Sequence, residues 1–114
     1  MIAVIFELEP RTGQEQRYFE IAAALKPVLE QTDGFISVER FESLARPGRY
    51  LSLSFWRDED AVRRWRNERC HRQGQQEGRS TVFADYRLRV AAVLRDYGLH
   101  EREQTPADSA ACLI

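Results

Sequence analysis

The first strand-like run of the chain is apolar on both of its faces, and this limits the folds that can hold it. One face carries Ile2, Val4, Phe6 and Leu8, and the other carries Ala3 and Ile5. A strand with only one buried face alternates apolar and polar residues, whereas a strand that is apolar on both faces is covered on both sides. The segment from Ile2 to Leu8 therefore predicts a strand that is covered on both of its faces.

The remaining periodicity predicts five further elements. Apolar residues recur at three- and four-residue steps over 14–31, which indicates a helix, and Pro27 is expected to kink or break it. Asp58 can cap a second helix, which becomes polar beyond Trp65 and loosens near Gly74 and Gly78. Strands are predicted over 35–44, 50–56 and 83–97, and the turn at 45–48 joins the first two of them into a hairpin.

The predicted order is β-α-β-β-α-β, an α+β arrangement of the ferredoxin-like type. It gives an antiparallel four-stranded sheet with two helices on one face. The other face of the sheet is then too apolar for water. We expect it to carry Ile2, Val4 and Phe6, or their alternates on the first strand, together with Tyr86, Leu88 and Val90 of the last strand. A partner sheet is the physical solution, so the prediction is a homodimer in which two sheets close into a barrel.

Length and composition place the chain among small globular proteins. Its 114 residues fit one domain, over 1–100, followed by a flexible tail over 101–114 whose composition turns to Glu, Gln, Pro, Ala and Ser. The 17 basic and 18 acidic residues leave no clustered excess of charge for a nucleic acid or an anionic membrane. No secretion signal or transmembrane run is evident, and the two cysteines form neither a disulfide framework nor a metal-ligand spacing. We expect a cytoplasmic protein.

The stretch from Leu53 to Arg79 contains the candidate functional residues. Both tryptophans and the more central of two histidines, His71, fall in this strand-helix unit. His71 could accept a phenolic proton as a catalytic base, or it could be a solvated histidine on a helix surface. Trp65 could form the wall of a substrate pocket, although core packing is the usual role of a helix tryptophan. The two residues are six positions apart, so they do not share one helical stripe.

Two further residues are candidates for substrate binding. Arg79 could neutralise an oxyanion or a carboxylate through its planar guanidinium, or it could be one solvated arginine among sixteen. Tyr86 could donate a hydrogen bond to a ligand, or it could fill the dimer barrel. No paired carboxylates, glycine-rich phosphate loop or Ser-His-Asp arrangement is found.

The chain resembles the antibiotic-biosynthesis monooxygenase (ABM) family of the dimeric α+β barrel superfamily. The resemblance covers residues 1 to about 100. It rests on the N-terminal strand, on GFISVERFES, on YLSLSFW followed by DEDAVRRW, and on YRLRVAAVLRDYG. The chain is also similar to a bacterial subgroup of the family in which a tryptophan, a histidine and a glycine-arginine pair follow the third strand. In this chain these residues are Trp65, His71 and Gly78-Arg79.

The resemblance implies a small monooxygenase that acts without a metal or flavin. Its substrate would be an aromatic or quinone-like molecule held between the helices and the sheet, with His71 as proton acceptor and Trp65, Arg79 and Tyr86 as binding residues. A haem-binding or haem-degrading protein is a second reading. It is disfavoured because the family's haem-ligand position, ten residues after Trp65, holds Gln75. The third reading is a non-catalytic dimeric barrel that binds a small hydrophobic ligand in a stress response.

Overall fold

The predicted order of elements is confirmed in the computed structural model, of which we describe residues 1–73 and 79–109, without the side chains of 69–73, 79 and 80. The elements are β1 (Ile2–Pro10), α1 (Glu15–Glu30), β2 (Phe35–Glu42), β3 (Tyr50–Trp56), α2 (Glu59–Gln73), α3 (Arg79–Val82), β4 (Phe83–Ala92) and a 3-10 turn, Ala107–Ser109. The short α3 and the 3-10 turn were not predicted. Helix α1 continues through Pro27, so the predicted break is absent.

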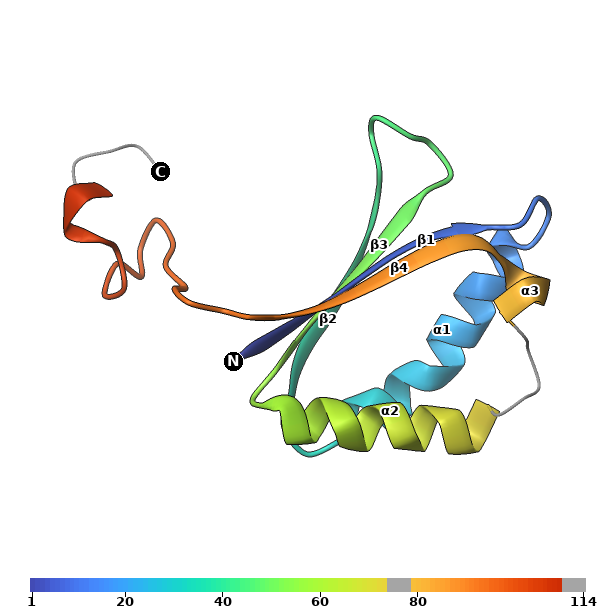
Figure 1. The fold of residues 1–114 in the computed structure, drawn as a ribbon, viewed down its shortest axis with the longest axis horizontal. Helices are drawn as coiled ribbons and strands as arrows, with labels where there is room; N and C mark the ends of the chain where they lie inside the picture. The colour runs from blue at the N-terminus through green and yellow to red at the C-terminus, as the bar shows by residue number, and fades with distance from the viewer. Residues whose placement is uncertain (74–78, 110–114) are drawn as a thin grey trace.

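The four strands form one antiparallel sheet in the order β2-β3-β1-β4. The doubly apolar strand β1 is therefore an interior strand, and β2 and β4 are the two edges. Helices α1 and α2 lie on the same side of the strongly twisted sheet (Figure 1). This is the ferredoxin-like arrangement.

The prediction that Tyr86, Leu88 and Val90 lie on the uncovered face of the sheet is wrong, because the register sets them opposite β1 residues that face the helices. The strand residues named above for the uncovered face lie on the helix side. They are Ile2, Val4, Phe6, Tyr86, Leu88 and Val90. Those of β1 pack against core clusters that contain helix residues, and those of β4 are opposite these β1 residues or Leu8. The face turned away from the helices carries the alternates instead: Ala3, Ile5, Leu51, Leu53 and Phe55. We call this second set the outer face. It remains strongly apolar, so the reason for expecting a cover on it stands.

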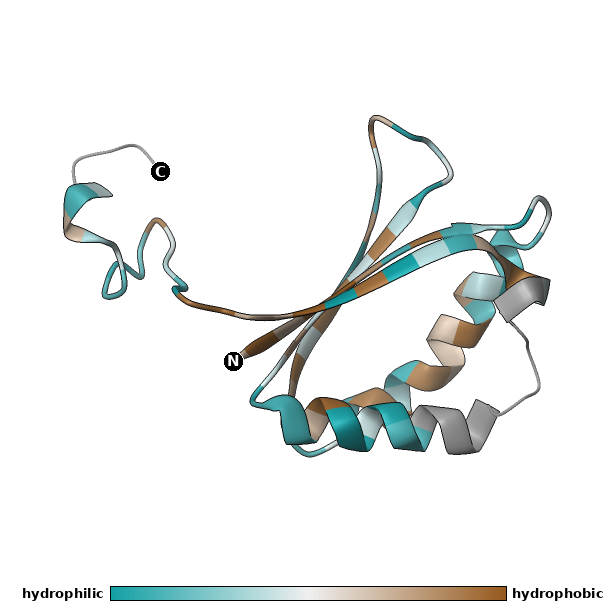
Figure 2. Ribbon diagram, viewed as in Figure 1, coloured by the Kyte–Doolittle hydropathy of each residue, from teal (hydrophilic) through white to brown (hydrophobic). Residues whose placement is uncertain are grey.

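The core consists of two clusters on the helix side, one at each end of β1. The first cluster joins Leu29 of α1, Trp56 of β3, and Ala61 and Val62 of α2. The second cluster joins Leu8, Tyr18 of α1 and Val82 of α3. In Figure 2 the coloured part of α2 is mainly hydrophilic, whereas α1 carries a longer apolar stripe.

An exposed ionic cluster fixes the start of α2 to the turn between α1 and β2. Arg57 donates two hydrogen bonds to the carboxylate of Asp33, at 3.1 Å each, and one to Asp58, at 3.1 Å. The other oxygen of Asp58 accepts the backbone N–H of Ala61 at 2.9 Å, which confirms the predicted cap. Arg64 donates to the backbone oxygen of Asp33 at 3.2 Å. The cluster therefore ties two segments that are distant in sequence.

We expect this cluster to make stability depend on acid pH. Hydrogen bonds from Arg57 lower the pKa of Asp33 below its usual 3.8, and the Ala61 N–H and Arg57 lower that of Asp58. A lowered carboxyl pKa adds stability that is complete above the ordinary value and is lost as the pH falls below it. In acid-urea titrations, Asp33→Asn should therefore reduce the loss of stability between about pH 4 and pH 2. Asp60→Asn is the matched control, because Asp60 pairs with Arg63 on the same helix. If both variants lose stability equally as the pH falls, the acid dependence does not come from the lowered pKa of Asp33.

The predicted last strand, 83–97, is wrong beyond Ala92. Ala92 is opposite Ile2, the first residue of β1, and the N–H of Val93 makes one more bond to the oxygen of Met1, at 3.0 Å. After that point β1 has no residue left to pair with. Residues 93–109 continue instead as an arm that leaves the body of the molecule (Figure 1). We call this segment the C-terminal arm.

Candidate functional site

A strip of the helix-side sheet between the two core clusters is incompletely covered. Val4 is opposite Val90 and Phe6 is opposite Leu88, so these four side chains form a continuous apolar band across β1 and β4. Val4 and Phe6 are partly buried, whereas Leu88 and Val90 are 41% and 44% exposed. We call this band the helix-face strip. This apolar surface is on the sheet face that carries the helices, yet part of it is exposed to solvent. Such a surface is suited to binding an apolar ligand.

Strand β3 extends the strip with small residues. Ser52 is opposite Phe6 and Ser54 is opposite Val4, so both hydroxyls lie on the helix side. Two large aromatics, Tyr50 and Trp56, stand at the ends of the same strand face. The indole N–H of Trp56 donates to the Ser54 hydroxyl at 2.9 Å, which satisfies both buried polar groups. On this face of β3, the small Ser52 and Ser54 therefore lie between the large Tyr50 and Trp56.

Trp65 and Tyr86, two of the predicted site residues, lie at opposite ends of the helix-face strip. Trp65 packs on Trp56 in a tilted arrangement, with ring centroids 6.3 Å apart, beside the first cluster. Tyr86 is opposite Leu8 and contacts Phe6 edge to face at 5.7 Å. On β1, Ile2 belongs to the cluster that Trp65 contacts, and Leu8 is opposite Tyr86. Ile2 and Leu8 are six residues apart, which corresponds to roughly 20 Å along the strand. The two side chains therefore bracket the strip without touching each other.

The other two predicted site residues lie outside the described side chains. His71 is within α2 and Arg79 begins α3, but the described part of the chain includes only their backbone. Their proposed roles, and those of Trp65 and Tyr86, remain predictions.

The sequence reasoning missed a polar pair at the second cluster. Arg40 of β2 donates from its Nε to the Tyr18 hydroxyl at 3.2 Å, and its guanidinium lies 5.8 Å from the centre of the same ring. Burial raises the pKa of Tyr18, and the hydrogen bond from Arg40 opposes this. The available signal was Arg40, a charged residue within a predicted strand. A charged side chain on the sheet face that the helices cover needs a polar partner there.

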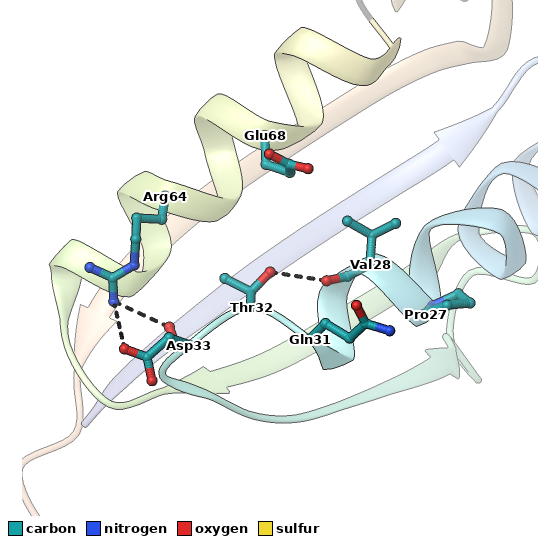
Figure 3. Close-up of a pocket in the computed structure, with 7 residues that line it drawn as sticks. All are labelled: Pro27, Val28, Gln31, Thr32, Asp33, Arg64 and Glu68. Atoms are coloured by element: carbon teal, nitrogen blue, oxygen red, sulfur yellow. Dashed lines mark hydrogen bonds and ion pairs between the residues drawn. The ribbon is translucent and has the colours of Figure 1, made fainter.

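A second hollow lies between the end of α1 and the middle of α2 (Figure 3). Its volume is about 400 Å³ and its lining is Pro27, Val28, Gln31, Thr32, Asp33, Arg64 and Glu68. Several of its polar groups already bond within the protein. Arg64 donates to Asp33, and the Thr32 hydroxyl donates to the Val28 oxygen at 3.1 Å. Of the two predicted site residues whose side chains are described, neither Trp65 nor Tyr86 lines this hollow, whereas both border the helix-face strip, which is therefore the candidate that we consider.

Two searches of the described residues gave negative results. No group of three or more His, Cys, Asp and Glu side chains among them is arranged to hold a metal ion. In the same part of the chain, no helix is both long and apolar enough to cross a membrane.

The fold and the sequence together define the class of the protein. The family model described as antibiotic biosynthesis monooxygenase matches residues 1–77. The chain therefore belongs to the ABM family.

Two relatives support this membership. A jasmonate monooxygenase of Pyricularia oryzae is 50% identical over 93 residues, which are 82% of this chain and 43% of that protein. The chain thus spans less than half the length of this relative. Protein YqjZ of Bacillus subtilis is 31% identical over 93 residues, which are 82% of this chain and 79% of that protein.

Solved structures show the same fold at low sequence identity. The Mycobacterium tuberculosis protein Rv0793 aligns with a TM-score of 0.73 and 18% identity, over 85% of this chain and 98% of that one. The haem degrader MhuD of the same organism aligns with a TM-score of 0.67 and 17% identity, over 86% of this chain and all of MhuD. At such identities the likeness establishes the fold alone.

Proposed function

We propose that the protein is a monooxygenase that oxidises a small, cyclic, mainly apolar molecule on the helix-face strip. The observation that carries this proposal is the 50% identity with an enzyme named as a jasmonate monooxygenase. The geometry supports it, because an apolar band with a hydroxyl-bearing floor lies between the two core clusters. Jasmonate, a small carboxylate with a five-membered ring, is the first substrate to test, and phenols that yield quinones are the second.

The residues of the strip suggest how such a molecule is held. Val4, Leu88 and Val90 bury the apolar part of the ring, and the Ser52 hydroxyl can bond to an oxygen of the substrate. Trp65 closes one end of the strip and Tyr86 the other. Arg79 pairs with a carboxylate or an oxyanion, and His71 takes the proton whose loss makes the substrate electron-rich enough to react with oxygen.

The balance of electrons separates the two substrate classes. When a phenol is oxidised to a quinone, two of its hydrogens leave with one oxygen atom as water, and the other oxygen atom becomes the new carbonyl. The phenol itself then supplies the electrons, and we propose that the protein needs no bound metal or flavin for this reaction. Hydroxylation of an aliphatic carbon of jasmonate also requires a two-electron reductant, for example a reduced nicotinamide.

The test of the function is oxygen uptake by the purified protein with jasmonate or a phenol panel, with and without a reduced nicotinamide. We expect His71→Ala to lower kcat by about 100-fold or more, the usual contribution of a general base. His100→Ala is the matched control, because His100 is the other histidine and is exposed on the C-terminal arm. Its activity should equal that of the unmodified protein. If neither substrate class consumes oxygen, and added haem gives a Soret shift, the haem-binding reading replaces this one.

We also propose that two copies associate through their outer faces. Ala3, Ile5, Leu51, Leu53 and Phe55 form an apolar surface that no element of the chain covers among the residues described. Charged groups close one end of it, where Glu7 pairs with Arg49 at 3.5 Å and with Arg89 at 3.3 Å. An apolar centre with a polar rim is typical of a protein interface. A second sheet packed on this face would complete the cover that the doubly apolar strand β1 requires.

A further inference from the structure

The helix-face strip continues across the sheet to a charged residue on the β2 edge. Arg40 of β2 is opposite Ser52 of β3, and Ser52 is opposite Phe6 of β1. The same row of residues ends at Leu88 on β4, which is opposite Phe6. Adjacent strands are about 4.8 Å apart, so the row from Arg40 to Leu88 spans roughly 14 Å. A guanidinium, a hydroxyl and an apolar surface therefore follow one another on the helix side of the sheet.

Arg40 is held on the helix side by one hydrogen bond, and its other donors remain. Its Nε donates to the Tyr18 hydroxyl at 3.2 Å, which leaves the two terminal nitrogens of the guanidinium. Among the residues described, no carboxylate forms an ion pair with Arg40. Glu42, two residues further along the same face of β2, accepts the N–H of Gly48 at 3.1 Å instead. Arg40 is exposed on an edge strand, so a solute can reach it.

The Tyr18 hydroxyl is a second donor beside this guanidinium. It accepts the bond from Arg40, and within the described part of the chain its own O–H proton has no acceptor. A tyrosine hydroxyl can accept and donate at the same time. Tyr18 is 5% exposed and its ring packs against Phe19, Tyr50 and Phe83, so the core fixes the position of the hydroxyl. Donors that are already held in place bind an anion at a smaller cost in conformational entropy.

We propose that Arg40, with the hydroxyls of Tyr18 and Ser52, binds a carboxylate of the substrate. The substrates are then small amphipathic anions, in which a short side chain joins an apolar ring to a carboxylate. The two terminal nitrogens of Arg40 match the two oxygens of a carboxylate, and the ring would lie on the apolar band beyond Ser52. This inference rests on the monooxygenase function proposed above. It assigns the carboxylate to Arg40 and leaves Arg79 for an oxyanion on the ring.

The experiment compares the binding of a carboxylic acid with that of its uncharged methyl ester. The probe pairs are jasmonate with methyl jasmonate, and para-hydroxyphenylacetate with its methyl ester, so that both proposed substrate classes are covered. Calorimetry gives the dissociation constants for the unmodified chain, Arg40→Gln and Arg40→Lys. Arg46→Gln is the matched control, because Arg46 is an exposed arginine in the turn between β2 and β3, outside the row described above. Circular dichroism checks that every variant is folded.

We expect the unmodified chain to bind at least one of the two acids about tenfold or more tightly than its ester, as a charged hydrogen bond would give. In Arg40→Gln this preference should disappear, because the acid binds more weakly while the affinity for the ester is unchanged. Arg40→Lys should retain part of the preference, since it keeps the charge and loses the planar fork. Arg46→Gln should retain all of it.

A purely structural role for Arg40 would give a different pattern. If Arg40 only joins β2 to α1, Arg40→Gln and Tyr18→Phe will both lower the free energy of unfolding, and neither will change the preference for acid over ester. That result would overturn the proposal, and so would an unmodified chain that binds neither acid more tightly than its ester. Oxygen uptake with phenols that lack a carboxylate is measured separately. Such uptake without any preference for acids would leave the monooxygenase in place and remove the carboxylate site alone.

Discussion

Gly34→Ala should lower the free energy of unfolding by about 2 to 5 kcal/mol. Gly34 has a φ of +91°, a left-handed conformation in which a side chain is strained by about 1 to 2 kcal/mol. A Cβ at this position would also lie 2.5 Å from the Cβ of Ala61, which is fully buried at the start of α2. Because a packed helix cannot yield cheaply, the overlap adds about 1 to 3 kcal/mol. Urea unfolding followed by circular dichroism measures the change.

The control for this prediction is Gly13→Ala. Gly13 has a similar φ of +83°, but no atom lies within 4 Å of a Cβ built there. It should therefore show the conformational cost alone, about 1 to 2 kcal/mol. A double variant, Gly34→Ala with Ala61→Gly, should recover part of the steric cost, since it removes one of the two overlapping carbons. If Gly34→Ala costs no more than Gly13→Ala, the close packing of α2 on the α1–β2 turn is wrong.

The position of Gly34 illustrates which parts of the fold a sequence can predict. Local periodicity identified the four strands and the two long helices, and the doubly apolar Ile2–Leu8 run predicted a strand covered on both faces. The contact between Gly34 and Ala61 joins residues 27 positions apart, so no local pattern indicates it. The end of β4 at Ala92 has a similar cause: it depends on where β1 begins, and residues 93–97 are as strand-like in sequence as those before them.

The candidate site was also only partly predictable, because local patterns do not indicate contacts between residues that are distant in sequence. The alternation of Tyr50–Trp56 assigned the two serines to one strand face, but only the register shows that this face is turned toward the helices and meets Phe6 and Val4. Leu88 and Val90 were expected on the uncovered face of the sheet. They lie on the helix side instead, because the register sets them opposite Phe6 and Val4, whose side chains pack against the core clusters. Register depends on the pairing of distant strands and has no signature in composition or spacing.

The two tryptophans, which share one strand-helix unit, should respond differently to truncation. Trp56 is 1% exposed and contacts both Phe35 and Trp65. Trp56→Ala should therefore cost about 3 to 5 kcal/mol of stability, the usual range for a buried tryptophan. It also leaves the buried Ser54 hydroxyl without its donor. This is a large share of the roughly 5 to 15 kcal/mol that stabilises a domain of this kind.

Trp65 is only partly buried, so Trp65→Ala should cost about 1 to 2 kcal/mol. If it closes the end of the helix-face strip, its loss should raise the KM for a cyclic substrate by about two- to tenfold, because an aromatic contact contributes about 0.5 to 1.5 kcal/mol. Urea unfolding and steady-state oxygen uptake, measured on both variants, separate the two roles. Trp65→Phe serves as the conservative control and should restore most of the KM. If Trp65→Ala leaves the KM unchanged, the substrate does not contact Trp65. If Trp65→Ala and Trp56→Ala lower the free energy of unfolding equally, Trp65 is a core residue like Trp56.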